Sequence, residues 1–375
     1  MGSIIHDLHE QYKKRDDFLF SPPPVLYIES VRGCPCSCAM CKPSSTKTKK
    51  ISMDLVKKIE PYFDRLEVLS IHGFGEPLLG DIEYFVEQSI KHDFIIHMNT
   101  TGSFLSERKA EILAKTRLSI RFSIHAGTKE TYNNIMGGDF DRVLKNISYF
   151  MQKLERNGIQ NDIWFSYLVM KDNIDEIESF LHIASDCGVK RVRFMRLSPA
   201  PSRFVQKMRD RDYVFKYQEQ SSRNVTNRFV ENMPHYEAIA SKLGIVIEPS
   251  SMVRGVDHHF LAQFLNKCSS KLLGGRKIFP FSRRKGTCLA PWFGQMLVNQ
   301  EGDVNLCCAS PYRLGNINDN SLDEIWNSKK MRKIRNSFKK GCYPQLCGYC
   351  DGFGFSEYPI NSSIRNLTNS NLSRQ

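Results

Sequence analysis

The chain has 375 residues, of which 41% are hydrophobic and 25% are charged. This composition excludes a disordered chain, and the lack of an apolar run of about 18 residues argues against a membrane-spanning helix. Lysine and arginine exceed aspartate and glutamate by 13, which indicates either a basic surface or a docking site for an anionic substrate or an acidic electron donor. No basic block with interleaved aromatic residues stands out, so nucleic acid is not an expected partner.

The cysteines are clustered. Residues 1–20 lack the apolar core of a signal peptide, so we expect a cytoplasmic protein. Disulfides are rare in the cytoplasm, and the twelve cysteines therefore need another explanation. Four of them fall between positions 34 and 41, and six fall between positions 288 and 350. Such clusters indicate metal or iron–sulfur ligands.

Short β-branched runs alternate with amphipathic segments of helical period between residues 24 and 200. Strands are expected at Val25–Val31, Glu67–His72, Phe94–Asn99, Leu118–His125, Ile163–Met170 and Val189–Leu197. Helices are expected at Asp54–Arg65, Leu79–His92, Glu107–Lys115, Phe140–Gly158 and Ile174–Cys187. This alternation predicts an α/β fold with a parallel sheet, open or closed into a barrel. In such folds the active site lies at the carboxyl ends of the strands.

The first cysteine cluster directly follows the first expected strand. Cys34, Cys38 and Cys41 have the spacing C-x3-C-x2-C. Thiolates at these intervals on one loop can hold one face of a cubane cluster, each binding one iron, and they leave the fourth iron open. A zinc site is the alternative, but it usually takes four ligands from paired knuckles. Free buried cysteines are a poor explanation for four thiols within eight loop residues.

This motif, placed after the first strand, resembles the signature of the radical S-adenosylmethionine (SAM) superfamily, whose members have a partial or full β/α barrel. The resemblance implies that Cys34, Cys38 and Cys41 hold a [4Fe–4S] cluster, with the amino and carboxylate groups of SAM on the fourth iron. Met40 then stands where the family often has an aromatic residue near the adenine. Cys36 is extra to the motif and is either a spectator or an alternative ligand.

Two further strand ends carry segments similar to those of the family. Gly73–Pro77 resembles the "GGE" segment that binds the methionine amino group, which makes Gly75 and Glu76 expected SAM contacts. Glycines let the backbone approach a ligand, and a carboxylate suits an ammonium group. Asn99 ends the third strand, where related enzymes place a polar residue near SAM.

The fourth strand end differs in part from the family pattern. Ser123 is similar to the ribose-contacting serine of the family's "SIDG" segment, but His125 replaces the usual aspartate. Met136 stands where relatives often carry an arginine. His125 either faces the substrate or is a plain hydrogen-bonded residue. No catalytic residue follows from these motifs.

The pattern breaks at residues 201–287, which we interpret as a linker or insertion with a weakly helical stretch at Asn224–Lys242. A hairpin is then expected at Gln295–Leu306, and a helix at Ser321–Phe338 that begins with a Ser-x-x-Glu capping box. The tail, rich in asparagine and serine, is expected to be disordered.

The second cysteine cluster accompanies this hairpin. Cys288 and Cys307 bracket it, and Cys347 and Cys350 form a C-x2-C knuckle, which makes four ligands for zinc or for a [4Fe–4S] cluster. The surrounding sequence resembles the SPASM/twitch domain. A full SPASM domain has a later C-x5-C-x3-C segment that this chain lacks, so the resemblance implies one auxiliary [4Fe–4S] cluster. Cys308, like Cys342, has no assigned role.

The expected architecture is a partial (β/α)6 radical SAM barrel with a small C-terminal α+β SPASM/twitch domain. The expected segments are an N-terminal extension, the barrel, the linker or insertion, the auxiliary-cluster domain and a tail, at residues 1–23, 24–200, 201–287, 288–352 and 353–375.

The resemblance also implies a reaction, in which SAM is cleaved reductively to a 5′-deoxyadenosyl radical that abstracts a substrate hydrogen. A one-cluster domain and a short segment before the first strand favour dehydrogenation of a small sugar-like or cyclitol-like substrate, which could be anionic. The auxiliary cluster would accept the second electron, and a flavodoxin- or ferredoxin-type donor would supply the first. The alternatives are a peptide-modifying enzyme, through epimerisation or C–C or C–S crosslinking, and a non-catalytic iron–sulfur or zinc scaffold.

Overall fold

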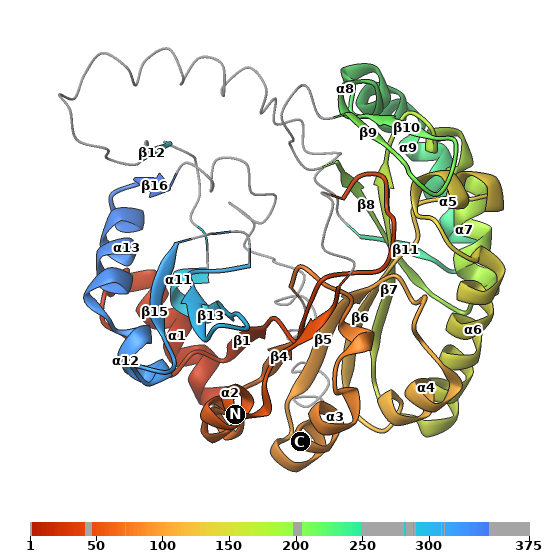
Figure 1. Ribbon diagram of the computed structural model, residues 1–375. Coiled ribbons are helices and arrows are strands. Elements are labelled where there is room, and N and C mark those ends of the chain that lie inside the picture. Colours follow the sequence, from red (N-terminus) through yellow and green to blue (C-terminus); the bar gives the residue numbers. More distant parts are fainter. Residues whose placement is uncertain are drawn as a thin grey trace. The chain divides into compact units, whose positions relative to one another are not determined.

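The computed structural model describes residues 2–41, 47–71, 73–197, 205–248, 281–282, 288, 290–308, 310 and 312–344 (Figure 1). The chain divides into two compact units. Unit 1 comprises residues 1–28, 52–69 and 255–375, and unit 2 comprises residues 29–51 and 70–254. Each unit draws on segments that are distant in sequence, and the domain boundaries expected from the sequence stay a prediction. Among the described helices, none is long and apolar enough to cross a membrane.

Unit 2 is built on a parallel sheet, as the alternating sequence pattern predicts. Its strands are β5 (Ile95–Thr100), β6 (Leu118–Ser123), β7 (Asp162–Val169), β8 (Arg191–Arg196) and β11 (Val246–Ile247). They lie in the order β11-β8-β7-β6-β5, and each neighbouring pair is parallel. Because β5 to β8 follow one another in both chain and space, every crossover advances the sheet in the same direction, as in a partial barrel.

Helices cover one face of this sheet (Figure 1). They are α3 (Ile82–His92), α4 (Glu107–Leu113), α5 (Lys129–Ile135), α6 (Phe140–Asn157), α7 (Ile177–Asp186) and α9 (Arg223–Lys242). The rings of Phe122, Phe165 and Phe194 on the strands lie 5.2–6.2 Å from phenylalanine rings of α6, α7 and α9. Each such buried ring stabilises the fold by about 2–3 kcal/mol. Side chains alternate along a strand. The residues immediately before and after each of these phenylalanines therefore face the opposite, inner side of the sheet.

The smaller elements of unit 2 lie beside the sheet. They are β2 (Val31–Arg32), β3 (Lys49–Lys50), η2 (Pro77–Leu79), η3 (Ile174–Glu176), β9 (Val205–Lys207), β10 (Val214–Lys216) and α8 (Tyr217–Gln220). Strands β9 and β10 form an antiparallel hairpin. The segment that the sequence suggested as a linker therefore contributes this hairpin, the helix α9 and the edge strand β11 in its described part. The weakly helical stretch expected there is confirmed by α9.

Unit 1 combines elements from both ends of the chain. They are α1 (Gly2–Lys14), β1 (Val25–Ile28), α2 (Met53–Ile59), η1 (Glu60–Arg65), β4 (Val68–Ser70, its last residue in unit 2), β12 (Phe281–Ser282), α11 (Ala290–Phe293), β13 (Gly294–Val298), β14 (Asp303–Asn305), β15 (Arg313–Asn316), α12 (Leu322–Trp326), α13 (Lys329–Lys339) and β16 (Tyr343–Pro344). The strands lie in the order β4-β1-β13-β14-β15. Strand β13 runs parallel to β1 and antiparallel to β14, which confirms the expected hairpin. The third strand, β15, was not expected.

The prediction of one helix at Ser321–Phe338 is wrong, because the structure has two helices there. Ser321 begins α12 with the expected capping box. Asn327 then ends that helix: its side chain accepts a hydrogen bond from the Leu19 amide at 3.0 Å and donates one to the Leu19 carbonyl at 2.8 Å. Ser328 caps the second helix, α13, by accepting from the Met331 amide. The break follows from a contact with a distant segment, which periodicity does not report.

Candidate cofactor site

The loop that carries the first cysteine cluster contacts three places in unit 2. Gly33 forms a parallel bridge with Gly75, which follows β4. The amide of Ala39 donates a hydrogen bond of 2.7 Å to the carbonyl of Ile135, at the end of α5. Cys36 Sγ lies 3.7 Å from the Thr101 hydroxyl, just beyond the carboxyl end of β5. The sequence thus brings the loop to the end of the sheet at which parallel α/β folds bind ligands.

Gly75 is required by this bridge. A Cβ atom at this position would lie 2.3 Å from the Val31 carbonyl oxygen and 2.8 Å from that of Gly33. Both oxygens belong to the backbone just before the first cysteine, so a side chain at position 75 would displace the start of the loop. The glycine at position 75 is therefore explained by the close approach of two backbones, and the SAM contact expected there stays a prediction.

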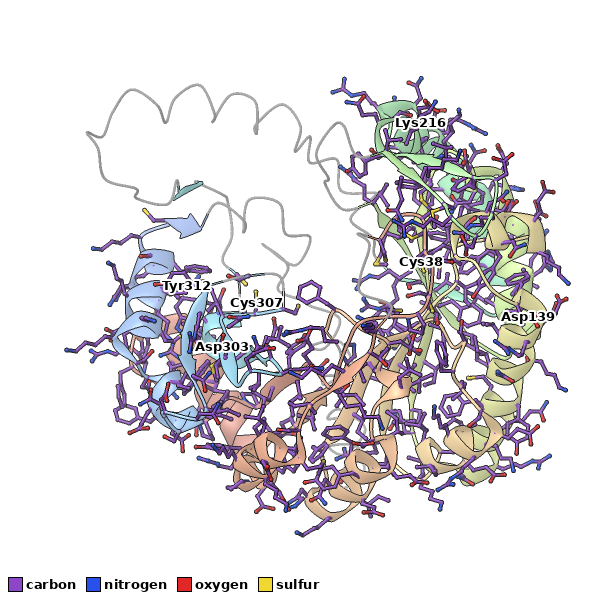
Figure 2. All side chains as sticks on the ribbon, viewed as in Figure 1. Cys38, Asp139, Lys216, Asp303, Cys307 and Tyr312 are labelled. Carbon is purple, nitrogen blue, oxygen red and sulfur yellow. The ribbon has the colours of Figure 1, made fainter. Side chains whose placement is uncertain are left out.

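The thiols of the loop approach one another in pairs. Cys38, labelled in Figure 2, is buried, Cys34 and Cys36 are half-buried, and Cys41 is exposed. A hydrogen bond with Cys36, together with burial, raises the pKa of Cys34, and a hydrogen bond with Cys41 raises that of Cys38. The same contact with Cys38 lowers the pKa of Cys41 to about 7. Thiolates are the form that binds iron, and a soft, sulfur-only donor set fits an iron–sulfur cluster.

A single metal ion and a cubane cluster place different demands on these thiols. Within the described part of the chain, no three Cys, His, Asp or Glu side chains converge closely enough to hold one metal ion. A zinc site needs every sulfur about 2.3 Å from one centre, whereas in a cubane each thiolate binds a different iron. The assignment of Cys34, Cys38 and Cys41 as ligands stays a prediction. Met40, expected near the adenine, is half-buried in the same loop.

Glu76 is buried and fully engaged by the chain itself. One carboxylate oxygen accepts hydrogen bonds from the Thr100 hydroxyl at 2.5 Å and the Leu78 amide at 3.2 Å. The other accepts from the Thr101 amide and hydroxyl, each at 3.1 Å. Burial raises the pKa of Glu76, and these four donors oppose that effect. Through these hydrogen bonds Glu76 connects β5 to the glycine-rich turn. A carboxylate has about four acceptor positions, and these donors fill them. An amino group of SAM would therefore have to displace one of these donors.

Asn99 carries a shielded acceptor atom that a ligand could use. It is half-buried at the end of β5, and its Oδ1 atom is shielded from solvent without a hydrogen-bond partner among the described residues. A buried acceptor without a hydrogen-bond donor lowers the stability of the folded chain. In the sheet register Asn99 lies opposite Arg121 of β6. Ser123, the last residue of β6, lies two positions further along the same face, half-buried.

A group of arginines on the inner face of the sheet was not predicted from the sequence. The guanidinium groups of Arg121, Arg191 and Arg193 lie 4.9, 4.9 and 5.4 Å from the centre of the Trp164 ring. Arg191 is neutralised by Asp162 and Glu248. The alternation Arg-x-Arg along β8 was the available signal, but it becomes meaningful only beside Trp164.

His125 is a hydrogen-bonded structural residue, the plainer of the two alternatives. It is 5% exposed, and its Nδ1 atom accepts a hydrogen bond from the Leu168 amide at 3.2 Å. The Asn173 side chain donates to its backbone carbonyl at 2.9 Å. Burial lowers the pKa of His125 to about 4, so the ring is neutral at ordinary pH.

Replacing His125 by glutamine is expected to weaken the pH dependence of stability. Between pH 4 and 6.5 the unfolded chain binds a proton at this position that the folded chain does not, so stability rises with pH across that window and is level above it. The two pKa values differ by an amount equivalent to about 3 kcal/mol. Thermal midpoints at pH 5 and pH 7.5 should differ less in this variant than in the parent or in a control at the exposed His182. Equal differences in all three would contradict the buried, neutral ring.

The residues of the second cysteine cluster are only partly within the described structure. Cys288 precedes α11 and Cys307 follows β14, and both are half-buried. Figure 2 shows Cys307 near Tyr312, whose carbonyl accepts a hydrogen bond of 3.0 Å from the Leu306 amide. Two of the four expected ligands, Cys347 and Cys350, lie outside the described residues. The auxiliary ligand set therefore stays a prediction.

Known families match both cysteine regions. Residues 28–184 match the model of the radical SAM superfamily, and residues 288–351 match that of SPASM, an iron–sulfur cluster-binding domain. The crystal structure of SuiB from Streptococcus suis superposes with a TM-score of 0.60 and 16% identity, covering 93% of this chain and 76% of SuiB. Its complex with the precursor peptide SuiA gives 0.59 and 15%, covering 93% and 75%.

A second solved protein has the same fold. The structure of anSMEcpe with bound AdoMet and the Cp18Cys peptide superposes with a TM-score of 0.58 and 19% identity, covering 88% of this chain and 86% of anSMEcpe. Comparison with curated proteins gave no match. At these identities the solved structures establish the fold, a mostly parallel α/β sheet with helices, and the family models establish the two domains.

Proposed function

We propose that this chain, which belongs to the radical SAM superfamily and carries a C-terminal SPASM domain, modifies a peptide at an unactivated carbon. Its domains imply SAM and [4Fe–4S] clusters as cofactors. When bound, SAM and the reduced cluster supply a radical that removes a hydrogen atom from the substrate. The peptide assignment is supported by the solved structures of SuiB and anSMEcpe, which cover most of this chain and hold peptides.

This proposal differs from the substrate that the sequence favoured. The short segment before the first strand and the single expected auxiliary cluster pointed to a small sugar-like compound. The solved relatives favour the peptide alternative. SuiB, whose fold this chain shares, binds a precursor peptide. Net oxidation of the substrate, an electron donor of the flavodoxin or ferredoxin type and a cytoplasmic location remain proposals.

The chain's own residues have defined tasks in this function. We assign the thiolates of Cys34, Cys38 and Cys41 to the cluster, and Gly75 to the close approach that shapes their loop. The unpartnered Oδ1 of Asn99 can accept a hydrogen bond from an amine or hydroxyl of SAM or of the substrate.

Arginines on the inner face of the sheet are compatible with an anionic group on the substrate. Arg121, Arg191 and Arg193 gather around Trp164, and Arg191 is paired with Asp162 and Glu248. Guanidinium groups bind the carboxylate of a peptide terminus or of an acidic side chain in paired hydrogen bonds. A phosphate on a small molecule has the same charge preference, so an experiment must separate the two substrate classes.

A fractionated extract separates them. Cells of the source organism grown in deuterated medium yield an extract that is divided by size into a peptide fraction and a small-molecule fraction. Each is added to the reconstituted protein with unlabelled SAM and dithionite. The proposal expects the peptide fraction to raise formation of 5′-deoxyadenosine and to place deuterium in it, and protease treatment to remove both effects. Deuterium transfer from the small-molecule fraction that survives protease would overturn the peptide assignment.

A further inference from the structure

Arg211 binds the backbone of the cysteine loop from outside the matched family region. It lies in the turn of the β9–β10 hairpin, and 11% of its side chain is exposed. Its Nη2 atom donates to the Ser37 carbonyl at 2.6 Å, and its Nη1 atom donates to the Ser37 hydroxyl at 2.9 Å. Ser37 stands between Cys36 and Cys38, so this one side chain grips the loop between the cysteines.

The same guanidinium also reaches the end of a helix. Its Nε atom donates to the Asn134 carbonyl at 2.9 Å, in the last turn of α5. A positive charge is favourable at the C-terminal end of a helix, where carbonyl groups lack partners in the helix. Arg211 therefore joins the cysteine loop to the end of α5, where the Ala39 amide is also bound.

Asp210 completes a network around Ser37. Its carboxylate accepts a hydrogen bond of 2.6 Å from the Ser37 hydroxyl and bonds of 2.8 and 2.9 Å from Arg211. The bond from Ser37 lowers the pKa of Asp210, so the carboxylate is charged at neutral pH. The network is thus an ion pair that shares one hydroxyl, and hydrogen bonds to charged groups are stronger than neutral ones.

The contact is closely packed and the hairpin is itself held in place. A Cβ atom at Gly137, which has a φ of +69°, would lie 2.5 Å from the Ser37 hydroxyl and 2.8 Å from Nη1 of Arg211. On the hairpin, the Tyr213 hydroxyl donates a hydrogen bond of 2.7 Å to Asp172, which follows β7. An exposed ion pair contributes little to a protein, but Arg211 is mostly buried and binds two backbone carbonyls.

We propose that Arg211 is a positioning residue for the first iron–sulfur cluster: by fixing Ser37 it fixes the spacing of the Cys34 and Cys38 thiolates on either side of it. The inference rests on the proposed assignment of Cys34, Cys38 and Cys41 as cluster ligands. It assigns a task to the hairpin that follows β8, which lies beyond residues 28–184 of the matched family model. Without the contacts between Arg211 and Ser37, the loop would reach conformations in which the thiolates no longer converge on one cluster. Iron would then leave faster.

The test measures iron loss rather than peptide modification. Arg211→Met, Arg211→Lys and the parent are reconstituted anaerobically, and a ferrous chelator then extracts iron while visible absorbance is followed. Arg228→Met is the matched control, because Arg228 is a half-exposed arginine that pairs with Asp175 elsewhere in unit 2. Circular dichroism verifies that each variant is folded.

Arg211→Met is expected to release about half of its iron at least tenfold faster than the parent. Arg211→Lys should lie between them, because an ammonium group cannot reach both carbonyls in the fixed geometry of a guanidinium. The control should match the parent. If Arg211→Met does not fold, Ser37→Ala, which removes only the hydroxyl contacts, should still accelerate the release. Folded variants at both positions that lose iron at the parent rate would overturn the proposed role of Arg211. A parent without a chelatable cluster would instead overturn the ligand assignment itself.

Discussion

A variant with Cys34, Cys38 and Cys41 all replaced by alanine is expected to lose about half of the parent's iron and all of its SAM cleavage. Two [4Fe–4S] clusters hold about eight irons, and each of the three thiolates binds a separate iron of the first cluster. Removing all three leaves that cluster without protein ligands and keeps the auxiliary one. Iron determination and chromatography of 5′-deoxyadenosine formed with dithionite measure both effects.

Cys36→Ala is the matched control for the triple variant. Cys36 lies in the same loop and contacts Thr101, but it is extra to the spacing of the motif. As a spectator, it should be replaceable with full iron content and near-parental SAM cleavage. Loss of the first cluster in this variant would move the ligand set to include Cys36. SAM cleavage that persists in the triple variant would contradict the assignment altogether.

Gly75→Ala is expected to lower SAM cleavage at least about 100-fold, since displacements near 1 Å at a reacting site can cost that much. The new methyl group would meet the carbonyl oxygens of Val31 and Gly33 at 2.3 and 2.8 Å, well inside contact distance. Both are backbone atoms, so relief requires the start of the cysteine loop to move. The rate of 5′-deoxyadenosine formation and the SAM dissociation constant, measured on reconstituted protein, test this.

Gly158→Ala separates this local effect from general destabilisation. Gly158 ends α6 with a φ of +61°, and a Cβ there would meet no atom within 4 Å. The strained backbone should cost about 1–2 kcal/mol of stability. SAM cleavage per folded molecule should be unchanged. If both glycine variants lose cleavage in proportion to their lost stability, Gly75 has no special role in the loop.

The parallel sheet could be predicted because its signals are local. Each of the six expected strands has a counterpart in the structure, and β5 to β8 form the expected parallel sheet. Hydrophobic period and turn residues suffice for this. The break between α12 and α13 could not be predicted, because it depends on Asn327 binding Leu19, 308 positions away. Helix α5 was missed as well, being a seven-residue helix between a loop and another helix.

The candidate site likewise has features that could be predicted from the sequence and features that could not. The cysteine spacing and Glu76 stand out in the sequence because their residue types and intervals are unusual. What Glu76 contacts could not be predicted, since its donors Thr100 and Thr101 come from the next strand end. Arg211 is 174 positions from Ser37, and nothing near it in the sequence marks it. Interactions between distant segments decide these roles.

The substrate class was the least predictable property. The length before the first strand suggested a small molecule, but segment lengths report on accessory modules and not on the surface that touches the substrate. The arginines around Trp164 on the inner face, for example, come from separate strands. Residue spacing along the chain carries little information about such a face.

Electron paramagnetic resonance of the dithionite-reduced parent, with and without SAM, tests the central claim that the cysteine loop holds a cluster with an open iron. SAM carrying 15N in its amino group and 17O in its carboxylate group is added to the fully reconstituted protein. The account predicts that the signal of one cluster changes and couples to both labels, that the other signal stays the same, and that the triple alanine variant shows no coupling. A parent with full iron content and no coupling to either label, or one that holds zinc in this loop, would contradict it.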